Sequence, residues 1–413
     1  MKISDYPDYI KRRIERVLRA SKNAKGYVKK YKKAGIEPSL RNFHELPFLT
    51  PEEISTNPLE FLTLPLSNVS FVFASSGTTG MPKLTLYSKE DIEETIKYFA
   101  RLSQFEGVTS NDRVVVYLPM RLWAAGPLTL YGHMYIGASA TPVDTAGSKE
   151  SKRRIIERVK PTVLSSMPST LLDLYDTQAP FRVRIVETTG EMLTSKVRRR
   201  LTTIFGGEVF DAYGLTEAPV GVECSRHNGY HYWEDAIILE VIDPDTGEPL
   251  PEGEVGEIVV TNLLRTAMPI IRYRTKDLGY ITHEKCSCGY NIPRVWVEGR
   301  IEQTIHLPDG VKLPVSMIIE ALSGFQMERR DIVIHVKNLG SKTLLELEAE
   351  GSERELEEKI EKVLSEELSP DITDLIDTGR LEIKVKIRPP GYLRKVYGGA
   401  MTSSKPLLRV FHH

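Results

Sequence analysis

The amino-acid sequence predicts an α/β protein with a large N-terminal domain, made of α/β subdomains and a small β-subdomain, and a small α+β domain at the C-terminal end. Between residues 113 and 211, strand-like segments alternate with helix-like segments, which favours a largely parallel sheet covered on both faces. From residue 236 the pattern changes to antiparallel strands around turns rich in proline and glycine. The composition changes again near residue 298, so we expect domains at 1–298 and 299–413.

The alternating segments have the lengths of ordinary strands and helices. RVVVYL at residues 113–118 is a continuous apolar run, typical of a strand buried on both faces. Further strands are expected at residues 140–143, 162–165, 183–187 and 208–211, and helices at residues 89–101, 128–136, 149–159, 168–175 and 194–205. Gly206 and Gly207 are expected to end the last of these helices.

Both ends of the chain also carry readable patterns. Apolar residues at helical spacing predict one or two helices over residues 8–35, and Pro51 is expected at the first position of a short helix. The remaining expected elements are strands at residues 236–242, 257–261, 332–336, 344–349 and 381–387, and an amphipathic helix at residues 353–368.

Length, charge and cysteine content exclude several classes of protein. A chain of 413 residues is too long for one ordinary core, and its net charge of −1 creates no global field toward nucleic acid or a membrane. No apolar run approaches the roughly 18 to 20 residues that span a bilayer, and MKISDYPDYIKRR lacks the apolar core of a signal peptide. The three cysteines are too few for a disulfide framework, which favours a reducing, cytoplasmic compartment.

One turn concentrates hydroxyls and glycines. ASSGTTGMPK runs from Ala74 to Lys83 and follows the apolar residues 69–73. Gly77 and Gly80 allow backbone amides to converge on one point, hydroxyls add donors, and the lysine adds positive charge, which together favour a polyphosphate ligand. Because the loop follows a strand, we expect it at the carboxyl end of the sheet, where open α/β folds bind ligands.

Three further motifs follow this loop in order: DAYGLTE at residues 211–217, RYRTKD at 272–277 and GRIE at 299–302. With these motifs the sequence resembles the adenylate-forming superfamily of acyl-CoA synthetases, peptide-synthetase adenylation domains and luciferases. It is most similar to the phenylacetate-CoA ligase branch, through KAGI…LPFLT before SSGTTG, EC…GYHYWED and CSCG. The resemblance runs nearly end to end, and SSGTTG and YGLTE are its most specific motifs.

The resemblance implies a reaction in two steps. A carboxylic acid and ATP would give an acyl-adenylate and pyrophosphate, and coenzyme A would then take the acyl group. Cations and oriented donors are needed because a carboxylate must approach a negatively charged α-phosphate. By the family's pattern, Glu217 would bind Mg²⁺, a hard ion that prefers oxygen ligands, and Thr216 would donate to the α-phosphate.

The resemblance also implies a nucleotide site. Tyr213 would stack on the adenine, with Gly190 and Glu191 as the opposite wall. Asp277 would accept from the ribose hydroxyls, assisted by Arg300. The residues implied to contact ATP or AMP are Ser75, Ser76, Gly77, Thr78, Thr79, Gly80, Lys83, Gly190, Glu191, Asp211, Tyr213 and Asp277.

In this family the small C-terminal domain swings between the two half-reactions, so the resemblance implies a mobile C-terminal domain. Its hinge would be Glu302, where the family usually has aspartate. A catalytic lysine is implied near the basic, apolar tail. Lys405 is the first choice because a Gly/Ser-rich loop precedes it, and Lys395 is the alternative.

All three cysteines, Cys224, Cys286 and Cys288, fall in one stretch together with His231. Thiolates and an imidazole form the N/S ligand set that zinc prefers, and the resemblance implies a structural zinc in some members of the branch. His227 is an alternative fourth ligand. With four protein ligands the metal would be structural, and the competing interpretation is three reduced, partly buried thiols.

The sequence leaves the acid and its acceptor open. LPMRLWAAGP at residues 118–127 is expected to line the acyl pocket. Met120 and Trp123 would favour an apolar or aromatic acid, whereas Arg121 could pair with a second carboxylate, and each has an alternative as core packing or surface. Two other functions compete with an acid–CoA ligase: adenylation followed by transfer to a carrier protein or amine, and non-catalytic nucleotide binding. Related ligases are often dimers, so a homodimer is also an expectation from the resemblance.

Overall fold

The computed structural model describes residues 3–75, 82–307, 311–322, 325, 331–340, 342–351, 356–397 and 407–413. The chain forms two compact units. Unit 1 comprises Met1–Ser166, Pro180–Gly190 and Gly206–Val297, and unit 2 comprises Met167–Ala179, Glu191–Phe205 and Glu298–His413. Within the described ranges, no helix combines the length and apolar character that crossing a bilayer requires.

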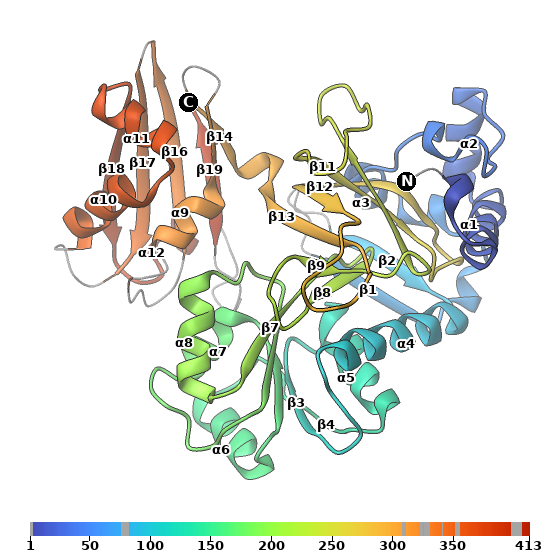
Figure 1. Cartoon of the computed structure of the whole chain (residues 1–413), viewed down its shortest axis with the longest axis horizontal. Coiled ribbons are helices and arrows are strands. Elements are labelled where there is room, and N and C mark those ends of the chain that lie inside the picture. Colours follow the sequence, from blue (N-terminus) through green and yellow to red (C-terminus); the bar gives the residue numbers. More distant parts are fainter. Residues whose placement is uncertain are drawn as a thin grey trace. The chain divides into compact units, whose positions relative to one another are not determined.

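Five parallel strands form one half of the large sheet of unit 1 (Figure 1). They are β3 (Arg113–Tyr117), β4 (Ser139–Pro142), β5 (Val163–Ser166), β6 (Ile185–Thr189) and β7 (Glu208–Gly214). All neighbours in the order β4-β3-β5-β6-β7 pair in parallel. Along the chain these strands alternate with α5 (Ala125–Ile136), α6 (Lys149–Val159), α7 (Pro168–Leu174) and α8 (Ser195–Phe205). The predicted alternation and the parallel sheet are therefore confirmed.

The same sheet continues from β7 with antiparallel strands, to a total of 11 strands. The order is β7-β8-β9-β13-β12-β11-β10, formed by β8 (Pro219–Glu223), β9 (Tyr230–His231), β10 (Ile237–Ile242), β11 (Gly256–Asn262), β12 (Ile270–Thr282) and β13 (Arg294–Arg300). The antiparallel pairing of the two strands predicted around residue 250 is confirmed. The sequence did not indicate that these strands extend the parallel sheet rather than forming a sheet of their own.

The loop with hydroxyls and glycines does not follow a strand of the large sheet, so that expectation is wrong. Instead β1 (Phe71–Ser75) and β2 (Lys83–Tyr87) form a separate antiparallel hairpin with Ser75 opposite Lys83. The apolar segment before the loop finds its partner immediately after the loop. Local antiparallel pairing therefore satisfies the backbone hydrogen bonds along one edge of β1, and on the other side the Ala74 amide donates to the Leu122 carbonyl at 2.8 Å.

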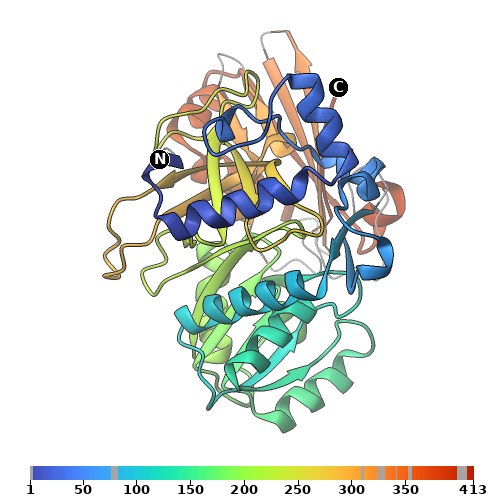
Figure 2. The ribbon, with the colours of Figure 1, turned by 90° about the vertical axis from the view of Figure 1, so that its right-hand side faces the viewer.

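Helices near the N-terminus complete unit 1. They are α1 (Asp8–Ser21), α2 (Lys25–Ala34), α3 (Pro51–Thr56) and α4 (Lys89–Phe105). Capping boxes start two of them, through Thr50 with Glu53 before α3 and Ser88 with Asp91 before α4. The apolar face of α1 packs with residues of β10 and β12 in one core cluster, and Figure 2 shows this dark blue helix lying across the yellow strands.

Unit 2 contains a four-stranded sheet with the order β18-β17-β16-β19. Its described elements after residue 300 are β14 (Thr304–His306), β15 (Lys312–Pro314), α9 (Val315–Leu322), β16 (Ile332–Leu339), β17 (Lys342–Glu350), α10 (Leu356–Glu367), α11 (Pro370–Asp377), β18 (Leu381–Arg388), α12 (Tyr392–Tyr397) and β19 (Leu408–His412). The three strands and the long helix predicted here are confirmed. The last strand, β19, pairs in parallel with β16 and was not predicted.

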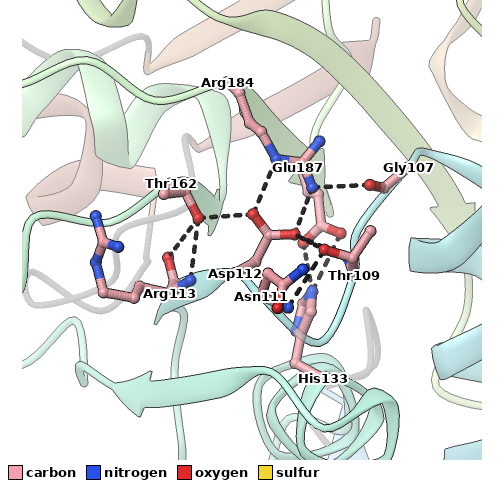
Figure 3. A network of polar contacts seen from close by, with 9 residues as sticks. All are labelled: Gly107, Thr109, Asn111, Asp112, Arg113, His133, Thr162, Arg184 and Glu187. Carbon is pink, nitrogen blue, oxygen red and sulfur yellow. Dashed lines mark hydrogen bonds and ion pairs between the residues drawn. The ribbon is translucent and has the colours of Figure 1, made fainter.

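A polar network ties together the amino ends of three adjacent parallel strands (Figure 3). Asp112, which precedes β3, accepts hydrogen bonds from Arg184 Nε at 2.8 Å, Thr162 Oγ1 at 2.7 Å and the amide of Thr109 at 2.8 Å. Thr162 precedes β5 and Arg184 precedes β6. Burial raises the pKa of Asp112, but these hydrogen bonds outweigh burial and hold that pKa well below its usual range.

We expect Asp112→Asn to lower the free energy of unfolding by about 1–3 kcal/mol at pH 7, because Arg184 loses its charged partner. Since the folded-state pKa of Asp112 is lowered, its contribution is complete above the unfolded pKa of about 3.9 and is lost as the pH falls below it. Urea unfolding at pH 7 and between pH 5 and pH 3 measures both effects. Asp245→Asn, in an exposed turn, is the control. A difference between Asp112→Asn and wild type that does not shrink in acid would contradict this explanation.

Candidate active site

The base of the β1–β2 hairpin carries two of the predicted phosphate-binding residues. Ser75 and Lys83 lie opposite each other across the hairpin. Ser75 Oγ is buried and has no hydrogen-bond partner within the described part of the chain. The predicted residues between them, Ser76, Gly77, Thr78, Thr79 and Gly80, lie outside the described residues.

Lys83 is anchored to a buried carboxylate. Its Nζ lies 2.8 Å from Glu217 Oε1 and donates to the hydroxyl of Tyr273 at 3.0 Å. Tyr273 in turn donates to the same Glu217 oxygen at 2.9 Å, and Glu217 is 1% exposed. Arg265 donates to the Glu217 carbonyl at 3.1 Å, which fixes the backbone. The fold thus brings together Lys83, which the sequence analysis assigned to phosphate, and Glu217, which it assigned to Mg²⁺. It adds Tyr273 from the RYRTKD motif, to which no role was assigned.

Tyr213 and Asp277 also meet, as a shared nucleotide site requires. The Tyr213 hydroxyl donates to Asp277 Oδ2 at 2.7 Å. Asp277 lies in an irregular part of β12, directly after Lys276, whose φ is 65°. The backbone irregularity changes the strand's direction locally, which is a common way to aim a side chain next to a site.

Asp211 lies two residues before Tyr213 on β7 and is buried. Its carboxylate accepts from Thr188 Oγ1 at 2.6 Å and from the Tyr230 hydroxyl at 2.7 Å. The Tyr230 ring lies 5.8 Å from that of Tyr213, centroid to centroid. These contacts support the strand and the ring of Tyr213, whereas a direct contact of Asp211 with nucleotide stays a prediction.

Gly190 follows β6 with a φ of 81°, in the left-handed region that favours glycine. The next residue, Glu191, belongs to unit 2, where it accepts from the amide of Ser169 at 3.0 Å and from its hydroxyl at 2.7 Å. Those two hydrogen bonds position the Glu191 side chain at the start of α7.

The remaining predicted residues lie in the C-terminal part of unit 2. Arg300 ends β13, and Glu302 is exposed in the short 3₁₀ turn η5 (Ile301–Gln303) that follows. Lys395 is exposed on α12. Lys405 lies outside the described residues, so the choice between the two lysines stays open.

A cavity of about 80 Å³ opens beside the YGLTE motif, within unit 1. Its lining is mostly apolar and includes Leu118, Trp123 and Leu128, together with Tyr213 and Thr216 of the motif. Of the segment 118–127, which the sequence analysis assigned to an acyl pocket, Leu118, Trp123, Ala124 and Ala125 line this cavity. Among the described residues, however, Met120 is not part of the lining, and Arg121 is exposed to solvent.

Two buried glutamates, Glu106 and Glu187, line the same cavity, and sequence reasoning missed both. Glu187 lies 3.1 Å from the Nε2 atom of His133 and accepts a short hydrogen bond from Ser165. Burial raises the pKa of Glu187, but His133 and Ser165 outweigh it and lower that pKa to about 2. Burial alone would lower the pKa of His133, and the charge of Glu187 raises it instead. His133 Nδ1 also lies 2.8 Å from the Thr129 carbonyl oxygen, so both ring nitrogens face acceptors, an arrangement that favours a protonated imidazole beside the Glu187 carboxylate.

The three cysteines and His231 form a compact cluster, with all four candidate ligand atoms within 4.8 Å of one another. Cys224 Sγ lies 3.8 Å from Cys286 Sγ, and Cys288 Sγ lies 3.6 Å from His231 Nε2. Tetrahedral zinc bonds of about 2.0–2.3 Å would separate ligand atoms by roughly 3.5–3.8 Å, so these two distances fit. The other ring nitrogen of His231 contacts the Ile292 carbonyl at 3.1 Å, which orients the ring. His227, the alternative ligand, is outside this cluster.

The charged and aromatic site beside an apolar cavity lies in a fold that comparison with known proteins assigns to a class of enzymes. The chain belongs to the AMP-binding enzyme family, which it matches over residues 16–264. It is 30% identical to phenylacetate-coenzyme A ligase of Thermus thermophilus over 89% of this chain and 88% of that protein. It is also 30% identical to phenylacetate-coenzyme A ligase of Escherichia coli, over 63% of each. The resemblance seen in the motifs is confirmed.

Solved structures support the fold. A crystal structure of 2-hydroxyisobutyryl-CoA ligase in the postadenylation state, in complex with 2-HIB-AMP, matches with a TM-score of 0.78 and 21% identity, over 92% of this chain and 86% of that chain. A second structure of that ligase, with R3-HIB-AMP, matches with a TM-score of 0.79 and 20% identity, over 98% and 89%. The predicted fold class is confirmed.

Proposed function

We propose that this protein is an ATP-dependent acid–CoA ligase. It joins a carboxylic acid to the α-phosphorus of ATP, with loss of pyrophosphate, and then exchanges AMP for the thiol of coenzyme A. The observation that carries the proposal is the Lys83–Glu217–Tyr273 cluster around the buried Glu217, which lies at the end of the YGLTE motif whose earlier residues line a mostly apolar cavity. The names of the relatives, which are CoA ligases, support the choice of acceptor.

The roles follow from charge and position. Lys83 and the hairpin loop would bind the β- and γ-phosphates, and Thr216, at the cavity, would donate to the α-phosphate as the carboxylate attacks it. Mg²⁺, when bound, would neutralise phosphate charge, and Glu217 fits as its protein ligand because this ion takes one or two carboxylates with phosphate oxygens. Tyr213 would stack on adenine, and Asp277 would accept from the ribose.

The second half-reaction needs the C-terminal domain. In the proposal this domain rotates about Glu302, with Arg300 assisting at the ribose and Lys405 or Lys395 supplying charge during adenylation. The exposed position of Glu302 in a short turn after β13 supports a hinge. Gly190 and Glu191 would complete the adenine pocket.

The proposal includes a structural zinc bound by Cys224, His231, Cys286 and Cys288. The ion would join the end of β8 to the segment between β12 and β13. In the proposal the three cysteines are free thiols that bind zinc and form no disulfide, which also supports a reducing, cytoplasmic location.

Pyrophosphate release from ATP and Mg²⁺ with a panel of carboxylic acids tests the function. We expect release that depends on the acid, and formation of an acyl-CoA when coenzyme A is added. Acid-dependent release without any thioester would favour transfer to a carrier protein or amine. ATP binding with no release for any acid would favour non-catalytic nucleotide binding and would overturn the proposal.

A further inference from the structure

One residue that lines the cavity has a buried side-chain oxygen with no hydrogen-bond partner among the described residues. Glu106 directly follows α4, is 7% exposed and lines the cavity. Its Oε1 is buried and has no hydrogen-bond partner among the described residues. A buried polar atom without a partner is costly and rare in a folded protein, so it marks a place where a ligand can supply the missing bond.

The charges around Glu106 decide which kind of group fits. Burial raises the pKa of Glu106 well above its usual range, and the nearby carboxylates of Glu187, Glu223 and Asp211 raise it further. The positive charge of His133 is taken up by Glu187. These effects favour the protonated form of Glu106, which can share its proton with the Glu187 carboxylate, and with that proton on Oε2 the Oε1 atom is left as an acceptor, as it also is in the ionised form.

The lining of the cavity combines an acidic part with apolar side chains. Ser165, Glu187 and Glu106 line one part of it, while Leu118, Trp123 and Leu128 belong to the apolar lining. Thr216, the residue proposed to act at the α-phosphate, lines it as well. A second carboxylate on the substrate would be repelled by the carboxyl groups of Glu106 and Glu187, whereas a hydroxyl or amino group could donate a hydrogen bond there.

We propose that Glu106 determines specificity, and that the acid used by this enzyme carries a hydrogen-bond donor, a hydroxyl or an amino group, at the end away from its reacting carboxylate. The inference rests on the proposed function, because it takes this cavity to be the acyl pocket. It also replaces the sequence-based suggestion that Arg121 selects a dicarboxylic acid.

The test uses pairs of acids that differ only by a methyl in place of a hydroxyl. The pairs are 4-methyl- and 4-hydroxyphenylacetate, 3-methyl- and 3-hydroxyphenylacetate, and heptanoate and 6-hydroxyhexanoate. For the pair that reaches Glu106, kcat/KM for pyrophosphate release by the wild type should favour the hydroxyl acid at least about tenfold, because a site built for a donor rejects analogues that lack it.

Two variants connect that preference to one side chain. Glu106→Gln keeps a carbonyl oxygen and a donor toward Glu187, so it should keep the preference. Glu106→Leu removes the acceptor and should reduce the preference to within about threefold or reverse it. Melting temperature and circular dichroism report whether each variant folds, and the wild-type ratios test the proposal even if a variant does not.

Direct binding separates this inference from the proposed function. Titration calorimetry measures the Kd of each acid with AMP present. Preference for the hydroxyl acids in binding, without pyrophosphate release, would support the inference and overturn the ligase assignment. Equal use of both members of every pair, or a preference for the methyl acids, would overturn the inference and leave the ligase intact, as would a preference that Glu106→Leu retains. No binding and no release would overturn both.

Discussion

Replacing Glu217 with glutamine is expected to lower kcat for acid-dependent pyrophosphate release by about 10²- to 10³-fold. The carboxylate is 1% exposed and is held by Lys83 and Tyr273, so the site is organised before the substrate arrives. Glutamine keeps the shape but loses the charge that positions Lys83 and that would bind Mg²⁺. The magnesium concentration for half-maximal activity should rise as well, which a titration of the residual activity measures.

Two controls distinguish charge at the site from general damage. Tyr273→Phe removes one hydrogen bond to Glu217 and leaves the carboxylate and Lys83 in place, so we expect a loss of about tenfold or less. Glu208→Gln changes a partly exposed carboxylate at the start of β7 and should leave kcat within about twofold. If Glu217→Gln retained more than about a third of wild-type activity with an unchanged magnesium requirement, Glu217 would have no part in adenylation.

Replacing Cys286 with serine is expected to abolish stoichiometric zinc and to lower Tm by on the order of 10 °C. The cluster joins the end of β8 to the segment before β13, so its loss releases two parts of the sheet that are otherwise connected through short pairings. Elemental analysis should find about one zinc per wild-type chain, and a chelator should lower the wild-type Tm toward that of the variant.

His227→Ala is the matched control for the cluster. His227 lies in the same stretch but outside the cluster, and it contacts Glu223 instead. Its replacement should retain zinc and change Tm by no more than about 3 °C. Wild-type protein that takes up no zinc when refolded with the metal, or Cys286→Ser with unchanged Tm, would mean that these thiols are only buried and reduced.

The predictions of secondary structure succeeded where a local pattern decides the element. The helix predicted at residues 149–159 is α6, with the same bounds, because its apolar positions recur at helical spacing and Ser148 caps it. The strand RVVVYL is confirmed because a continuous apolar run needs cover on both faces, as a central parallel strand provides. The hairpin at Ser75 was misplaced because an apolar run does not say which strand it pairs with.

The buried acidic residues that line the cavity could not be predicted from the sequence for a related reason. His133 lies in the apolar segment LTLYGHMYI, and Glu106 directly follows a helix. Neither residue belongs to a sequence motif or has a neighbour along the chain that indicates a functional role. Their chemistry arises from contact with Glu187, which lies more than fifty residues along the chain from either of them.

By itself the sequence determined the class of fold, the parallel strands and the family, because periodicity and ordered motifs are local properties of a chain. Only the tertiary structure decided that the antiparallel strands extend the same sheet, and it brings the sequence-predicted set of three cysteines and His231 together in one cluster. It also decided that Glu106 lines the cavity and that its Oε1 is buried without a hydrogen-bond partner among the described residues. These outcomes depend on which distant segments come into contact, and hydrogen-bond partners and burial are fixed only by that contact.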